Sequence, residues 1–248
     1  MAVQRHLNNA PITEAILDIR LKLPTNVKSS TFLSLHPQIA QRYPGKQERR
    51  RWEGQIVIAG SQAPKTKSTV GEVDGYLFRS ADDKQIIQFR LDGFTFNRMR
   101  PYENWESFRD EARRLWNVYI EAVSPEQISR IALRYINHLL IPGPTVNFED
   151  YLAAGPVVPE KLPQGVSSFL TRIVIYEPDT KASAIITHAL EKVIKPDIIP
   201  IILDLDVIKE SPFEVNYQQM WETFEKLRDF KNRIFFESVT EKALELFQ

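Results

Sequence analysis

The sequence predicts an α+β protein built from two similar units, each ordered strand, helix, three strands and long helix. Three observations lead to this prediction: apolar residues alternate in several segments, they recur every three or four residues in two others, and several segments repeat about 116 residues apart. We expect the units to span residues 1–124 and 125–248. They are expected to share one mainly antiparallel sheet, with the long helices packed on one face, in a single pseudo-symmetric body.

The first half begins with a strand over residues 14–23, where apolar and charged side chains alternate. Ser29 or Ser30 can cap a helix that runs to about Tyr43. Further strands are expected over 52–59, 76–80 and 85–99, separated by a polar loop over 62–69 and a turn at 81–83. A long helix follows, with Asn104 as its N-cap and an apolar stripe that ends at Val123.

The second half repeats this order. A strand over 128–141 is followed by a short helix over 147–154, and three strands are expected over 168–176, 182–193 and 198–208. An amphipathic helix over 217–238 comes next, and Thr240 is placed to cap a final turn. The stretch 155–165 is rich in glycine and proline and is predicted to be a loop within this half.

The repeat is visible in the residues themselves. The segment WESF at 105–108 recurs as WETF at 221–224, and YIEAVS at 119–124 matches FFESVT at 235–240. The same offset aligns Glu14 and Asp18 with Arg130 and Arg134, and Arg90 with Asp206. If the first strands of the two halves pair antiparallel, the acidic pair and the basic pair are expected to form cross-strand ion pairs.

Composition limits the classes of function. The 248 residues contain 32 basic and 32 acidic residues, so the net charge is zero and the chain lacks the overall basic excess of many nucleic-acid-binding proteins. This zero is a cancellation, because the first half has 19 basic and 14 acidic residues and the second half has 13 and 18. The absence of cysteine excludes disulfides, cysteine-ligated metals and a cysteine nucleophile.

Other patterns predict a cytoplasmic protein with no membrane segment, no metal site and no cofactor. No secretory leader or membrane-spanning run is recognisable at the sequence level. The four histidines lack metal-ligand spacing, and no glycine-rich phosphate loop or nucleophile elbow is present. We therefore predict no catalytic residue, although a site assembled from distant residues stays open.

Seven arginines are candidate binding residues for an anionic partner. They form a cluster of three beside Trp52, a pair at the end of the strand expected over 85–99 and a pair on the first strand of the second half: Arg49, Arg50, Arg51, Arg98, Arg100, Arg130 and Arg134. The alternative is that they are solvated or form ion pairs within the protein. Asp204 and Asp206 lie on one face of a strand and could hold a divalent cation, but a solvated or ion-paired face explains them as well.

Five segments resemble a family of proteins. They are NAPITEAI at 9–16, NRMRPYENW at 97–105, RIALRYIN at 130–137, LDLD at 203–206 and FFESVTE at 235–241. In this order they are similar to a sporadically distributed bacterial family of uncharacterised proteins with an N-terminal NAPI-x-EAI signature. The resemblance implies no activity, cofactor or site residue. The patchy distribution of the family implies an accessory role in antiviral defence, including CRISPR loci.

Three functions follow as hypotheses. The leading one is a non-enzymatic protein-interaction protein that binds a protein partner or a second copy of itself, since oppositely charged halves permit head-to-tail association. The first alternative is a nucleic-acid-binding factor that uses the seven arginines. The second alternative is a metal-dependent enzyme centred on Asp204 and Asp206.

Overall fold

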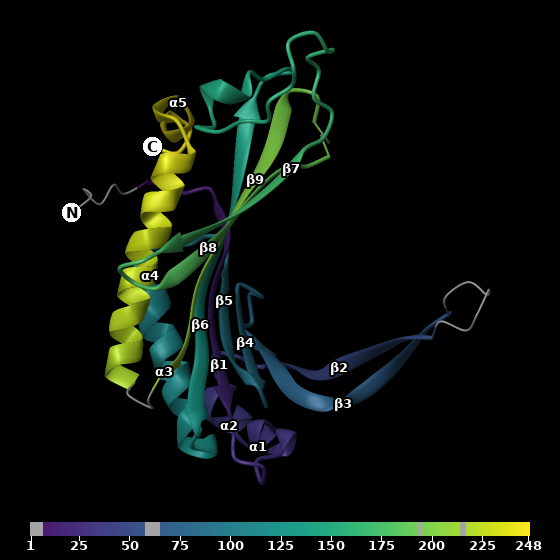
Figure 1. Cartoon of the computed structure of the whole chain (residues 1–248). Coiled ribbons are helices and arrows are strands. Elements are labelled where there is room, and N and C mark those ends of the chain that lie inside the picture. The colour runs from purple at the N-terminus through teal and green to yellow at the C-terminus, as the bar shows by residue number, and fades with distance from the viewer. Residues whose placement is uncertain (1–6, 58–64, 193–194, 214–216) are drawn as a thin grey trace.

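The computed structural model describes residues 7–57, 65–192, 195–213 and 217–248 (Figure 1). The strands are β1 (Ile12–Lys22), β2 (Gly45–Val57), β3 (Lys65–Arg79), β4 (Gln85–Arg90), β5 (Gly93–Met99), β6 (Gln127–Pro142), β7 (Leu170–Glu177), β8 (Ala182–Leu190) and β9 (Ile198–Phe213). The helices are α1 (Ser29–Ser34), α2 (His36–Ile39), α3 (Trp105–Val123), the 3-10 turn η1 (Phe148–Asp150), α4 (Tyr217–Ser238) and α5 (Glu241–Glu245). None of the helices described is both long enough and apolar enough to span a bilayer.

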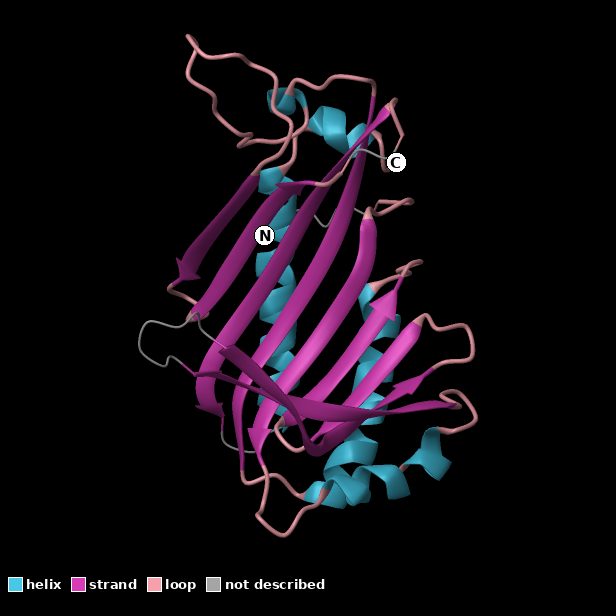
Figure 2. Ribbon diagram, turned by 90° about the vertical axis from the view of Figure 1, so that its right-hand side faces the viewer, coloured by secondary structure: helices cyan, strands magenta, loops and turns pink. Residues whose placement is uncertain are grey.

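All nine strands belong to one antiparallel sheet, in the order β2-β3-β4-β5-β1-β6-β9-β8-β7. One face is apolar: Ala15, Leu17 and Ile19 of β1 are fully buried there, as the period-two alternation requires. Helices α3 and α4 lie along this face (Figure 1). The opposite face, here called the open face, is covered by none of the described helices, and the β2–β3 hairpin projects from it and crosses in front of the sheet (Figure 2).

The predicted α+β class is wrong. The described chain is mainly one nine-stranded antiparallel sheet, and among its helices only α3 and α4 are longer than six residues. The strands take more of the chain than their apolar patterns indicate: β2 and β3 are 13 and 15 residues long, and β6 and β9 have 16 each. Backbone hydrogen bonds of the sheet also stabilise strands where the side chains are polar, and the side-chain pattern of such segments predicts a loop.

The predicted order of three strands in the first half is also wrong, because this half has four strands between α2 and α3. The expected strand over 85–99 is the hairpin β4–β5, which reverses just before Gly93. Gly93 lies against β1 so closely that a Cβ atom there would be 2.2 Å from the carbonyl oxygen of Ile19. Only glycine permits this approach. The predicted loop over 62–69 partly lies outside the described residues, and β3 begins at Lys65 within it.

Two of the N-cap residues predicted from the sequence are found at the starts of helices. The Asn104 side chain accepts a hydrogen bond from the Ser107 amide at 2.8 Å, which confirms it as the N-cap of α3. Thr240 caps α5 in the same way through the Ala243 amide. The short helix expected over 147–154 is reduced to the three-residue turn η1, and no Asn147 side-chain cap forms there.

The register of the two central strands is symmetric. Leu17 of β1 lies opposite Leu133 of β6, and these residues are separated by the 116-residue offset of the sequence repeat. This is the register that a two-fold axis between the two predicted repeats would produce. The aligned pair Arg90 and Asp206 does not fit it. Asp206 lies beside β6, whereas the strand beside β1 is β5, which places Thr95 in the matching position.

Candidate functional site

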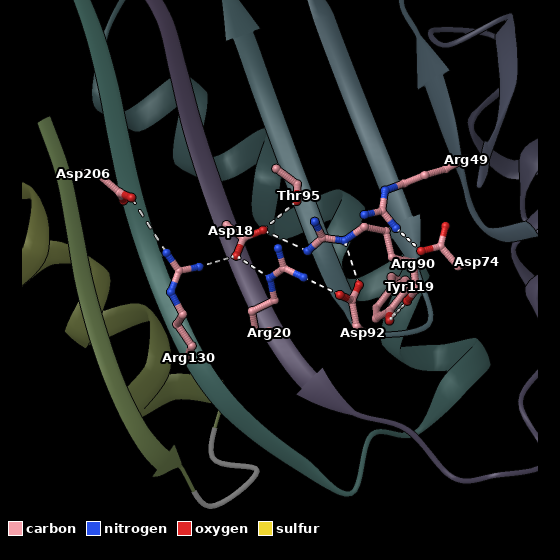
Figure 3. Close-up of polar contacts among 10 residues, drawn as sticks. All are labelled: Asp18, Arg20, Arg49, Asp74, Arg90, Asp92, Thr95, Tyr119, Arg130 and Asp206. Atoms are coloured by element: carbon pink, nitrogen blue, oxygen red, sulfur yellow. Dashed lines mark hydrogen bonds and ion pairs between the residues drawn. The ribbon is translucent and has the colours of Figure 1, made fainter. Parts of the chain in front are cut away.

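The open face carries a network of ion pairs centred on Asp18 of β1 (Figure 3). The Asp18 carboxylate accepts hydrogen bonds from Arg90 of β4 and from Arg130 of β6, each at 2.9 Å. It also accepts one from the Thr95 hydroxyl at 2.8 Å and one from Arg20 at 3.2 Å. One carboxylate therefore joins four strands of the sheet.

Charges on both sides extend this network. Asp92 contacts Arg20 and lies 3.2 Å from Arg90, and Asp206 of β9 lies 3.9 Å from Arg130. Burial alone would raise the pKa of Asp18, but the neighbouring guanidinium groups, that of Arg90 first, hold this pKa below its usual value. The pKa of Asp206 is raised, because burial outweighs its more distant arginines.

The predicted ion pairs between the central strands form in part. Asp18 meets Arg130 across the β1–β6 pair, which confirms the antiparallel pairing and this contact. Glu14 instead accepts a hydrogen bond from Asn97, and Arg134 forms a bidentate pair with Asp204 at 2.9 and 2.6 Å. Asp204 and Asp206 thus lie at ion-pair distance from Arg134 and Arg130, respectively. Within the described residues no group of three histidine, aspartate or glutamate side chains is placed to hold a metal ion.

Most of the seven candidate arginines face carboxylates of the same chain. Arg49 pairs with Asp74, Arg50 with Glu48 at 2.7 Å, and Arg98 with Glu103 at 2.7 Å. Arg130 and Arg134 belong to the open-face pairs described above. Arg51 and Arg100 are exposed. The structure does not bring the seven together into one basic surface, because they lie on β2, β5, β6 and the segment after β5.

The two outer strands of the sheet differ in character. At one edge, β2 presents charged side chains such as Lys46, Glu48 and Arg50, which discourage a further strand from pairing. At the other edge, β7 pairs only with β8 within the described chain, and its large apolar residues are exposed. Leu170 is 73% exposed, Val174 58% and Tyr176 62%. An exposed apolar edge strand is a site for strand addition.

The sequence predicts a strand at β7, but it does not predict that the apolar side chains of this strand are exposed. The sequence LTRIVIYE resembles a buried strand, because its apolar residues are nearly continuous. In the structure Arg172, Val174 and Tyr176 share one exposed face of β7, whereas Glu177, on the other face, is paired with Arg233 of α4. The exposure of β7 follows from its position at the edge of the sheet. That position depends on pairing between segments that are distant in the sequence.

A cavity of about 250 Å³ lies on the helix side of the sheet. Its walls come from four places in the chain: the segment before β1, residues 102–106 at the start of α3, Asn137 of β6 and the second half of α4. Lys231 of α4 lines it, with its side chain almost completely buried. Lys231 is not among the residues predicted from the sequence, although it occupies a position of the apolar stripe of α4, four residues from Leu227.

No protein-family model matches the chain, and a search of curated proteins finds no significant relative. The resemblance of the five segments to a bacterial family therefore stays a prediction from the sequence.

Proposed function

We propose that this protein is a non-enzymatic interaction protein that self-associates through β7, so that two sheets join into one antiparallel sheet. The observation that carries the proposal is the exposed edge strand β7, because a mainly apolar edge whose only charged residues are Arg172 and Glu177 favours pairing with another strand. The opposite edge is protected by charged residues, so association through β7 would form a closed dimer and not an open filament.

The residues of β7 favour a second copy of the same strand as the occupant. In an antiparallel pair centred on Val174, the two Val174 side chains meet, and Arg172 of each copy faces Tyr176 of the other. Arginine over an aromatic ring is a favourable contact. Arg172 and Glu177 are the only charged residues of the strand, and this register places no like charges opposite each other.

The other two hypotheses receive less support. Five of the seven candidate arginines are paired with carboxylates, which lowers the positive potential available to a phosphate backbone. Asp204 and Asp206 are likewise engaged by arginines. An accessory role in antiviral defence is compatible with a self-associating interaction protein and rests on the sequence resemblance alone.

Val174→Glu is expected to convert the dimer into a monomer. The substitution places two carboxylates opposite each other at the centre of the proposed interface, where like charges destabilise pairing. Val174 is exposed in the single chain, so the fold itself should tolerate the change. We expect sedimentation velocity to show at least a hundredfold weaker dimerisation at unchanged far-ultraviolet circular dichroism.

Leu33→Glu is the matched control, since Leu33 is an exposed apolar residue of α1, far from β7 (Figure 1). This variant should dimerise like the unmodified protein. The proposal fails if the unmodified protein is a monomer at all concentrations up to about 100 μM, or if both glutamate variants weaken the dimer equally.

A further inference from the structure

We infer that the cavity between α4, the start of α3 and the segment before β1 binds a small organic carboxylate, whose negative charge is held by Lys231. This site is independent of β7 and of the proposed self-association. The inference rests on the surroundings of Lys231, on the positive groups that converge near it and on the walls of the cavity.

Among the residues that the structure describes, Lys231 has no counter-ion. Its residue is only 8% exposed, and its ammonium group lies 3.7 Å from the centroid of the Tyr135 ring. Within the described part of the chain, no carboxylate lies at ion-pair distance from it. A buried ammonium group usually requires a paired negative charge, and the ring supplies only the weaker cation–π contact. A ligand carboxylate in the cavity would supply the missing charge.

Other positive groups converge on the same cavity. Arg228 lines it one turn before Lys231 on α4, although this arginine also lies 3.6 Å from the Asp229 carboxylate. Trp105 and Glu106 form the first turn of the 19-residue helix α3, where backbone N–H groups have no partner within the helix and the helix dipole is positive. The Asn104 side chain is already used by the Ser107 amide. An anion is therefore favoured from two helices at once.

The negative and neutral groups around Lys231 do not replace such a ligand. Glu103 is paired with Arg98, and Glu106 lies on the wall formed by α3. The hydroxyls of Tyr102 and Tyr135 are hydrogen-bonded to each other at 3.0 Å, and burial raises the pKa of Tyr102 to about 12, so both stay protonated at neutral pH. Burial and the nearby Arg228 lower the pKa of Lys231 to about 7.

The walls define the rest of the ligand. The lining is part polar and part apolar, and its apolar part is largely aromatic: Pro11, Tyr102, Trp105 and Phe235. A volume of about 250 Å³ is slightly below the usual range of ligand pockets and favours a small ligand. These features fit a carboxylate with a compact apolar body, such as an aromatic acid. Four of the segments that carry the family resemblance, 9–16, 97–105, 130–137 and 235–241, contribute to these walls.

The test is isothermal titration calorimetry at pH 7.5 with benzoate, phenylacetate and hexanoate, with the matched amides benzamide and phenylacetamide as uncharged controls. Inorganic phosphate serves as a second anion. We expect at least one carboxylate to bind at least tenfold more tightly than its amide and than phosphate. Binding should be accompanied by proton uptake, visible as a heat that depends on the ionisation enthalpy of the buffer, because a carboxylate beside Lys231 raises its pKa.

Lys231→Met is expected to weaken carboxylate binding at least tenfold and to abolish the proton uptake. Lys226→Met is the control, because Lys226 is an exposed lysine of the same helix. It should leave both quantities unchanged. Equal binding of carboxylates and amides, stronger binding of phosphate, no binding at millimolar concentration or equal effects of the two lysine variants would each overturn the inference.

Discussion

Replacing Asp18 with asparagine is expected to lower the free energy of unfolding by roughly 3–5 kcal/mol, the usual effect of removing one partner from a buried ion pair. Asp18 contacts Arg90, Arg20 and Arg130. The Arg90 side chain is only 5% exposed, so it cannot recover its hydration when the Asp18 charge is removed. Urea unfolding followed by tryptophan fluorescence measures this loss.

The pH dependence of the same effect has a definite sign. The folded-state pKa of Asp18 lies below its ordinary value of 3.8. Its contribution to stability is therefore fully present above about pH 5 and is lost as the pH falls through the folded-state pKa. The difference in stability between the unmodified protein and Asp18→Asn should shrink in that range.

Asp110→Asn, at an exposed ion pair with Arg109, should change stability by less than about 1 kcal/mol. A similar small loss for Asp18→Asn would show that the network is not a stabilising centre.

Without added ligand, the stability of the unmodified protein is expected to rise by about 2 kcal/mol between pH 7 and pH 9, and Lys231→Met should abolish this rise. The pKa of Lys231 is about 7 in the folded protein and near 10.5 in the unfolded chain. Between these values the unfolded chain binds more protons, so raising the pH favours the folded state. Below pH 7 Lys231 is protonated in both the folded protein and the unfolded chain, so the buried ammonium group destabilises the folded state to its full extent.

Urea unfolding at pH 6, 7, 8 and 9 tests this prediction. Lys231→Met should be more stable than the unmodified protein at pH 6, because methionine fills a similar volume without a buried charge. Lys226→Met should keep the pH dependence of the unmodified protein. A flat profile in the unmodified protein, or a rise that persists in Lys231→Met, would show that Lys231 is not the titrating group.

The sequence repeat predicted the centre of the sheet well. Because Asp18 and Arg130 occupy complementary positions of the two first strands, their ion pair followed from an alignment and a period of two. The same alignment did not predict the partners of Glu14 and Arg90 correctly. The partners of these residues depend on how β4 and β5 fold back on β1, and Gly93 permits that turn through a close approach that no periodicity reveals.

The candidate sites depended on distant contacts and were not predicted. Lys231 carried one local signal, a lysine in the apolar stripe of α4, but the cavity beside it requires the start of α3 and the segment before β1. The exposure of β7 follows from its place at the end of the sheet. The basic clusters were visible in the sequence, yet the carboxylates that neutralise them come mainly from other strands or turns.

The most direct measurement of the proposed self-association is disulfide formation by Val174→Cys. The chain contains no cysteine, so any disulfide must form between copies. Directly opposite residues in an antiparallel pair have Cα atoms about 4.5–5.5 Å apart, a separation that a disulfide spans. Under mild oxidation we expect Val174→Cys to give a covalent dimer on a non-reducing gel, whereas Leu33→Cys stays monomeric. Monomer alone for Val174→Cys, or equal cross-linking of the two variants, would contradict the pairing of β7 with itself.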